Sequence, residues 1–208
     1  MNCSRTLSLF ACITLCLLLT ACGSTRVTGL WKKSDYAGPP FESLMVVGLT
    51  GELINKTLWE NIMAERLRQN GLSTALSVNS FPADGVVSER EIISQVIAQG
   101  LDGVLVSRLV DTRTEEVYYP PMGGYYDGPF GYYDRFSRYY PHAYHRVYSP
   151  GYVTTFTSVL LETNLYDANQ QLIWSMSTDT LGFDSVNQLA DSVSKKVVEL
   201  LRKDGLIR

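Results

Sequence analysis

Residues 44–49 read LMVVGL, a short apolar run typical of a strand that is buried on both faces. A helical pattern of apolar residues follows from Ile54 to Asn70 and ends at Gly71, which suits the carboxy-terminal cap of a helix. Leu72 to Val78 has the composition of a second strand. This strand–helix–strand order predicts parallel neighbours joined by a right-handed crossover.

The same alternation continues further along the chain. Ser88 and Glu91 have the spacing of a capping box, and the helix that they predict ends at Gly100. A third strand starts at Gly103 and becomes polar as it continues to Thr112. The order β-α-β-α-β is therefore predicted for this half of the domain.

An antiparallel β-hairpin and a helix are predicted for the carboxy-terminal part. Residues 152–166 are rich in Thr, Val and Phe, and residues 171–180 read as a second strand after a turn at 167–170. The last helix is expected from Ser185 to Lys203. Its apolar face comprises Val186, Leu189, Val193, Val197 and Leu200. The fold class is α/β, a single domain with a mixed sheet in which β-α-β-α-β is followed by the hairpin and the helix.

The first 22 residues have the pattern of a targeting signal. Arg5 precedes an apolar run, Leu7 to Leu19, that is too short for a transmembrane helix of ~20 residues but suits a signal peptide. The run closes with the sequence LTAC at residues 19–22, which resembles the lipobox of bacterial lipoproteins. This resemblance implies a signal peptide at residues 1–21, cleavage before Cys22, and diacylglyceryl and acyl (palmitate-type) groups on Cys22. The alternative is an ordinary secretory signal with a chance cysteine.

The positions of the cysteines agree with a lipid anchor. All four, Cys3, Cys12, Cys16 and Cys22, lie in the first 22 residues, so the processed chain has no free thiol for catalysis or metal binding. Two or more acyl chains hold a protein stably on a membrane. Gly23 stands where an aspartate commonly retains lipoproteins in the inner membrane, and this resembles the outer-membrane case, facing the periplasm.

Residues 22–43 are predicted to be a lipid-anchored tether, and residues 44–208 the α/β domain. The 21 residues after Cys22 reach at most ~70 Å when fully extended, so we expect the domain to work close to its membrane. The formal net charge of −3 becomes −4 when Arg5 is removed with the signal peptide. This mildly acidic balance argues against a nucleic-acid partner, which requires a basic face.

Residues 117–152 form a Tyr/Gly/Pro-rich insert that holds 11 of the 13 tyrosines. Four units, YYPPMGG, YYDGPFG, YYDRFSR and YYPHAYH, follow one another every seven residues. Their tyrosine doublets are the candidate partner contacts: Tyr118, Tyr119, Tyr125, Tyr126, Tyr132, Tyr133, Tyr139 and Tyr140. Two interpretations stay open. The insert is a repeat-expanded loop without a role, or it is a surface that contacts an envelope protein, a glycan or copies of itself.

Both histidines of the chain lie in the insert. His142 and His145 form an H-x-x-H pair that Asp127 or Asp134 would have to complete, so solvated histidines are expected and no metal or other cofactor is predicted.

The processed chain lacks a nucleophile elbow, a phosphate-binding loop and an H-E-x-x-H helix. Glu162 and Asp102 are acid/base candidates by residue type alone, and salt-bridge or turn roles are expected for them. The sequence predicts a protein without enzymatic activity.

Several motifs are spread along the domain and the segment before it. They read VTGLWKK at 27–33, FESLMVVGL at 41–49, GLDGVLV at 100–106, SPGY at 149–152, LETNLYD at 161–167 and KDGL at 203–206. Together with the lipobox, they resemble a largely uncharacterised family of small proteobacterial outer-membrane lipoproteins. The β-α-β-α-β order is more distantly similar to the curli secretion lipoprotein, the amino-terminal domain of the Tol-Pal propeller protein, and a lipoprotein activator of peptidoglycan synthase.

Those relatives are assembly parts or partner-binding modules, and no functional residue is transferred from them. The resemblance implies a non-enzymatic binding or assembly module in the periplasm. The alternatives are an envelope enzyme that uses carboxylate acid/base residues, or a subunit of an oligomeric secretion or export assembly.

Overall fold

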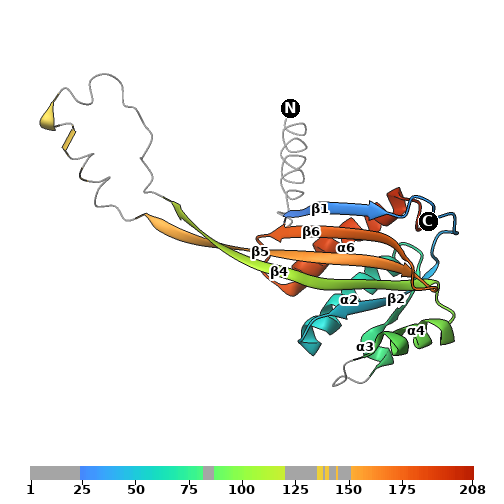
Figure 1. Cartoon of the computed structure of the whole chain (residues 1–208). Helices are drawn as coiled ribbons and strands as arrows, with labels where there is room; N and C mark the ends of the chain where they lie inside the picture. Colours follow the sequence, from blue (N-terminus) through green and yellow to red (C-terminus); the bar gives the residue numbers. More distant parts are fainter. Residues whose placement is uncertain (1–23, 82–86, 120–134, 138, 141–143, 145–150) are drawn as a thin grey trace, which may run out of the picture. The chain divides into compact units, whose positions relative to one another are not determined.

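The computed structural model describes residues 24–81, 87–119, 135–137, 139–140, 144 and 151–208 (Figure 1). The elements are β1 (Ser24–Lys32), β2 (Ser43–Leu49), α2 (Leu53–Arg68), β3 (Ser73–Leu76), α3 (Ser77–Ser80), α4 (Glu89–Ala98), β4 (Gly103–Tyr119), β5 (Tyr152–Asp167), β6 (Leu172–Leu181) and α6 (Val186–Lys203). The strands form one mixed sheet in the order β1-β6-β5-β4-β2-β3. The chain divides into two compact units, the second being Thr112–Ser158 and the first the rest.

The predicted β-α-β-α-β order is confirmed as β2-α2-β3-α4-β4, with the short helix α3 added between β3 and α4. The strand predicted from Leu72 to Val78 is shorter, because it ends at Leu76 and Ser77–Ser80 form α3. Strand β2 pairs in parallel with β3 and β4, so that Leu44 lies opposite both Thr74 and Gly103. The capping box of α4 is present, because the amide of Ser88 donates to the Glu91 carboxylate at 2.8 Å and the Glu91 amide donates to the Ser88 hydroxyl. These contacts place α4 on the chain where the sequence predicts it.

Alternate side chains of β2 face two separate cores, as the two-residue period of a strand requires. Leu44 and Val46 belong to the larger core beneath α2 and α6. Met45 and Val47 belong to a smaller core with Val96 of α4. The sheet is therefore covered by α2 and α6 on one face, and by α4 over part of the other (Figure 1).

The second half of the fold also follows the prediction. The arrows of β5 and β6 point in opposite directions (Figure 1), and the predicted turn joins them. The carboxylate of Asp167 accepts hydrogen bonds from the amides of Asn169 and Gln171 at 2.9 and 2.8 Å. Gln170 has a positive φ of 66°, which closes the turn.

The predicted tether, residues 22–43, is corrected in part. Residues 24–32 form the edge strand β1, which pairs antiparallel with β6 so that Ser24 lies opposite Leu181 and Lys32 lies opposite Trp174. The free edge of β6 offers backbone donors and acceptors that β1 satisfies. The predicted start of the insert at residue 117 is also corrected, because residues 117–119 still belong to strand β4.

Helix α6 begins after Ser185, whose hydroxyl accepts from the amide of Gln188 at 3.2 Å. The prediction of its buried face is confirmed for Leu189, Val193 and Val197, but it is wrong at the two ends of the helix. Val186 and Leu200 are only partly buried, whereas Leu201, outside the predicted face, is fully buried. The reason is that α6 packs against α2 as well as the sheet, and this wider contact buries a broader stripe.

Candidate functional site

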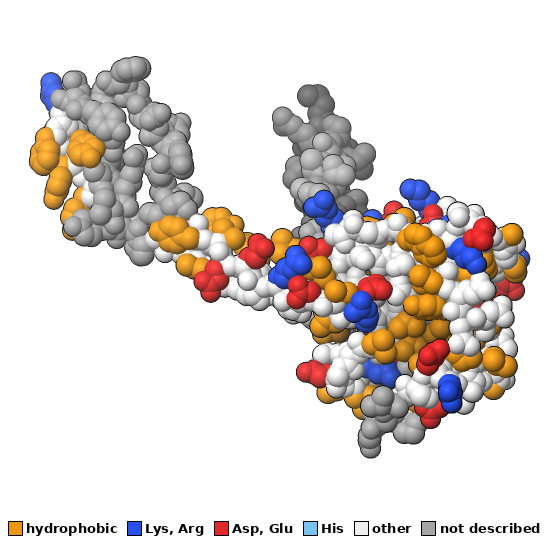
Figure 2. Space-filling view, in the orientation of Figure 1, with side chains coloured by type: hydrophobic (Ala, Val, Ile, Leu, Met, Phe, Trp, Pro, Cys, Tyr) orange, Lys and Arg blue, Asp and Glu red, His pale blue; other side chains and the backbone are white. Residues whose placement is uncertain are grey.

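The second unit exposes a group of aromatic side chains where β4 ends and β5 begins. Tyr118, Tyr119 and Tyr152 are between 38% and 62% exposed, and Val117 and Val153 beside them are exposed as well. The rings of Tyr119 and Tyr152 stack with their centroids 5.1 Å apart and their planes at 12°. Figure 2 shows hydrophobic side chains gathered at these strand ends. We call these five residues the aromatic hairpin surface.

Local packing orients the hairpin surface. The ring of Tyr118 lies against the backbone of Gly151, where a Cβ atom would overlap the Tyr118 hydroxyl and ring. Glycine at this position lets the ring lie close to the strand. Stacking across a strand pair, as between Tyr119 and Tyr152, contributes about 0.5–1.5 kcal/mol. The tyrosines are thus held as a surface while much of each ring stays accessible.

Phe136, Tyr140 and Tyr144 form a second aromatic group in this unit. They follow one another at intervals of four residues, with ring centroids 5.1 and 5.9 Å apart. The amide of Tyr139 donates to the carbonyl of Arg135, which is the spacing of one helical turn. All three rings are about half exposed or more.

The predicted contact residues are described in part. Tyr118, Tyr119, Tyr139 and Tyr140 are exposed, as a contact role requires. Four others, Tyr125, Tyr126, Tyr132 and Tyr133, lie outside the described residues, as do Cys22, His142 and His145. The doublet pattern did not identify Tyr152, Phe136 and Tyr144, because each stands singly in the sequence. Only the structure shows that the ring of Tyr152 stacks on that of Tyr119, and that the rings of Phe136 and Tyr144 lie against that of Tyr140.

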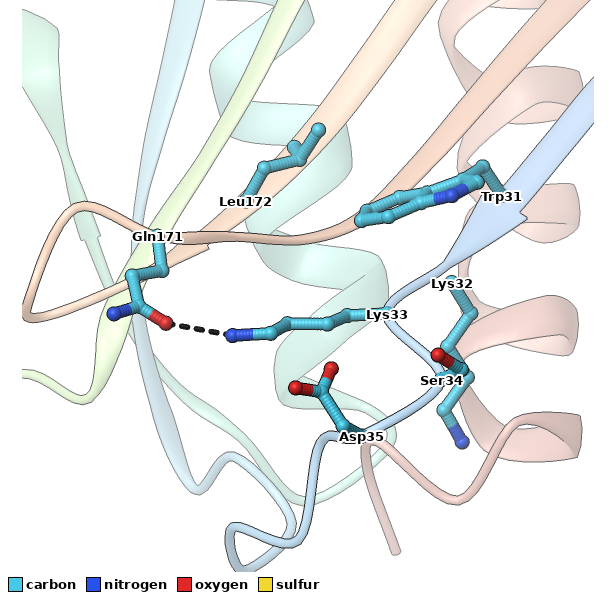
Figure 3. Close-up of a pocket in the computed structure, with 7 residues that line it drawn as sticks. All are labelled: Trp31, Lys32, Lys33, Ser34, Asp35, Gln171 and Leu172. Carbon is cyan, nitrogen blue, oxygen red and sulfur yellow. Dashed lines mark hydrogen bonds between the residues drawn. The ribbon is translucent and has the colours of Figure 1, made fainter.

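The first unit has a pocket of 680 Å³ at the end of β1 (Figure 3). Its lining residues are Trp31, Lys32, Lys33, Ser34, Asp35, Gln171 and Leu172. Trp31 lies beside Leu172. The ammonium group of Lys33 donates a 2.7 Å hydrogen bond to the side-chain amide oxygen of Gln171. The ammonium group of Lys32 donates to the carbonyl of Asp204 at 2.6 Å. This pocket presents an aromatic ring and polar groups, a composition suited to binding.

The two acid/base candidates have structural partners. The Glu162 carboxylate accepts from Asn164 at 2.6 Å and from Arg108 at 2.5 Å. These hydrogen bonds, with that from Asn164 the stronger influence, lower the pKa of Glu162 below its ordinary value. Glu162 is therefore ionised at neutral pH and unsuited to act as a general acid. Asp102 accepts from the amides of Glu42 and Ser43 and so joins the starts of β2 and β4.

The residues that the structure describes hold neither a cluster of metal ligands nor a membrane-spanning helix. No group of three or more His, Cys, Asp or Glu side chains there is arranged to hold a metal ion. Among the helices that the structure describes, none is long and apolar enough to cross a membrane.

Comparisons with known proteins show similarity to solved structures only. No protein-family model matches the chain, and no curated protein matches it significantly. The chain is similar to a PelC dodecamer from Paraburkholderia phytofirmans, in a substituted form at 17% identity and TM-score 0.45, over 85% of this chain and 95% of that one. It is also similar to a PelC dodecamer from the same organism in a second crystal form, at 16% identity and TM-score 0.46, over 89% of this chain and 99% of that one. At this identity and TM-score the similarity shows no family and supports no assignment of function.

Proposed function

We propose that this chain is a lipid-anchored outer-membrane lipoprotein that binds an envelope protein in the periplasm through the aromatic hairpin surface, without catalysing a reaction. The observation that carries the proposal is the exposure of Tyr118, Tyr119 and Tyr152 together with two valines. Tyrosine is enriched at protein interfaces because it offers a large, rigid apolar face and a hydroxyl. A mixture of stacked aromatic and aliphatic side chains suits a protein partner.

The carboxylates of the first unit support a role without catalysis. Glu60, Asp102 and Glu162 each accept hydrogen bonds that hold two or more elements or neighbouring side chains together. A general acid or base needs a proton-accepting position open to a substrate. Each of these three carboxylates instead has at least one oxygen that accepts hydrogen bonds from groups of the fold.

Lipid attachment is tested by replacing Cys22 with serine. Because only a thiol receives the diacylglyceryl group, Cys22→Ser is expected to leave the unprocessed precursor, whereas the natural chain gains the mass of its lipid. Intact-mass measurement of both proteins from membranes checks this. Ala21→Gly, which keeps a small residue before the cysteine, is the control and should be processed. An unmodified amino terminus on the natural protein would disprove the anchor.

The contact surface is tested with the triple variant Tyr118→Ala, Tyr119→Ala, Tyr152→Ala. We expect capture of a partner from solubilised native envelopes to fall about tenfold or more, because interface hot spots are enriched in tyrosine and each contributes about 2 kcal/mol or more. Ile54→Ala removes a large, exposed apolar side chain from α2 in the first unit, away from both sites described above, and is the control. Quantitative mass spectrometry of the captured proteins gives the measurement.

Three outcomes would count against this surface: full partner capture by the triple variant, equal loss of capture in Ile54→Ala, or an effect seen only as glycan binding or self-association. Sedimentation of the purified chain detects self-association. A binding assay with purified envelope glycan detects the other alternative.

A further inference from the structure

We propose that the pocket at the end of β1 binds a chain of β-linked pyranose sugars. One sugar ring stacks on Trp31, and its polar substituents bond to Lys33, Asp35 and Gln171. All the lining residues belong to the first unit, whereas the aromatic hairpin surface belongs to the second, so this site is independent of the proposed protein contact. Its volume of 680 Å³ lies within the ~300–1,000 Å³ that is typical of small-ligand sites.

The Trp31 side chain supplies the apolar part of the site. Trp31 is 48% exposed, whereas the other two tryptophans, Trp59 and Trp174, are 7% and 0% exposed. Its cross-strand neighbour on β6 is Ser175, whose small side chain cannot cover an indole ring. The electron-rich face of an indole attracts the C–H groups on the flat face of a pyranose, which carry a small positive charge. Stacking therefore buries apolar surface on both partners.

The polar groups beside the ring match the hydroxyl and amide groups of a sugar. Figure 3 shows Lys33 extending to Gln171, and the Asp35 carboxylate turned toward the Lys33 side chain. The Lys33 ammonium group, which has three protons, donates to the Gln171 amide oxygen at 2.7 Å. Within the described part of the chain, the Gln171 amide nitrogen and the Asp35 carboxylate make no hydrogen bond. The site thus offers donors and an acceptor, and a sugar hydroxyl pairs with either.

Backbone hydrogen bonds hold both loops of the pocket in place. The amide of Lys33 donates to the carbonyl of Ile173 on β6 at 2.9 Å, and the amide of Tyr36 closes a turn by donating to the carbonyl of Lys33 at 3.3 Å. On the other side, the Asp167 carboxylate accepts from the amide of Gln171 at 2.8 Å. Loops that are already ordered lose little conformational entropy on binding, so the pocket is prepared for a ligand.

The charges of the pocket favour a neutral ligand. Lys32 points away from the pocket, and its ammonium group donates to the carbonyl of Asp204 at 2.6 Å (Figure 3). The charges of Lys33 and Asp35 then balance. A phosphate group would meet a carboxylate beside a single cation, and a wholly apolar ligand would leave the polar groups without partners. A sugar fits because its ring faces are apolar and its edges carry hydroxyl groups.

Stacking also selects the kind of sugar. An axial hydroxyl group would hold the ring away from the indole face and lose close contacts. Glucose and N-acetylglucosamine in β-1,4 linkage have equatorial substituents and present the flattest apolar face. Most of the lining side chains are exposed, so neighbouring sugars of a chain can continue past the pocket.

Isothermal titration calorimetry of the full-length protein in detergent tests the site, with the β-1,4-linked tetrasaccharide of N-acetylglucosamine as the probe. We expect saturable binding that Trp31→Ala weakens about tenfold or more, because the stacking surface is lost. Trp31→Phe keeps an aromatic ring and is expected to lose less. Leu30→Ala is the matched control. Leu30 is 47% exposed on the opposite face of β1, and its replacement is expected to leave the affinity unchanged.

The polar part of the site is tested with Asp35→Ala and Gln171→Ala. Each is expected to weaken binding about two- to tenfold, the usual effect of losing one hydrogen bond. Acrylamide quenching of fluorescence then locates the sugar. Trp31 is the one exposed tryptophan among the three, so saturating tetrasaccharide is expected to reduce quenching in the natural protein.

The proposal is overturned if the tetrasaccharide does not bind saturably, or if Trp31→Ala binds it as tightly as the natural protein. Binding that leaves acrylamide quenching unchanged also overturns it, because the sugar would then lie elsewhere. Binding of inorganic phosphate in place of the tetrasaccharide would identify an anion site instead. The triple tyrosine variant is expected to bind the tetrasaccharide normally, and Trp31→Ala to capture the envelope partner normally. Failure of either site is therefore distinguishable from failure of the other.

Discussion

Replacing Glu60 with alanine is expected to lower the free energy of unfolding by about 3–5 kcal/mol. Glu60 is fully buried on α2. Its carboxylate accepts from the Gly48 amide at 2.9 Å, the Ser77 hydroxyl at 2.5 Å and the Val78 amide at 2.9 Å. Alanine would leave all three donors without this acceptor, one near the end of β2 and two in α3, where water has little access.

Urea unfolding of Glu60→Ala checks this expectation. Glu60→Gln is expected to lose less, because the amide oxygen still accepts a hydrogen bond while the charge is lost. Glu65→Ala, on the exposed side of the same helix, is the matched control and is expected to change stability little. If Glu60→Ala and Glu65→Ala unfold at the same urea concentration, the carboxylate does not hold these elements together.

Replacing Leu201 with alanine is expected to cost about 2–5 kcal/mol, the usual range for a large apolar residue truncated in a packed core. Leu201 is 0% exposed in the larger core beneath α6. Its neighbour Leu200 is only partly buried, so Leu200→Ala is expected to cost clearly less. The two variants remove the same atoms from adjacent positions, and they differ only in burial.

Thermal unfolding of the two leucine variants should rank Leu201→Ala below Leu200→Ala in midpoint. Tyr140→Ala, which truncates a half-exposed ring in the second unit, is expected to shift the midpoint least. The opposite ranking of the two leucines would show that the buried face of α6 has been assigned wrongly.

The local elements of this fold were predictable from the sequence. Ser88 and Glu91 define the start of α4 through contacts three residues apart, and Asp167 closes the β5–β6 turn through amides two and four residues away. The candidate tyrosines were found in the same way, since Tyr118 and Tyr119 begin a repeat that is visible in the chain. Each of these features depends on residues close together in sequence.

The sequence did not predict β1 as a strand. Val27 and Leu30 stand among polar and glycine residues, and the segment has no clear two-residue alternation. It becomes a strand because β6, about 150 residues later, offers it a free edge. The stacking of Tyr119 on Tyr152 depends in the same way on strands separated by the whole insert.

By itself, the sequence determined the order of the elements from β2 to α6 apart from α3, the capping box of α4, the β5–β6 turn, and the repeat that marks the candidate contact surface, because periodicity and capping act over a few residues. Only the tertiary structure decided that Glu60 joins α2 to two segments, that Leu201 rather than Leu200 is fully buried, and that β1 brings the folded sheet to within one residue of Cys22. These features depend on contacts between residues far apart in the chain, which no local pattern records.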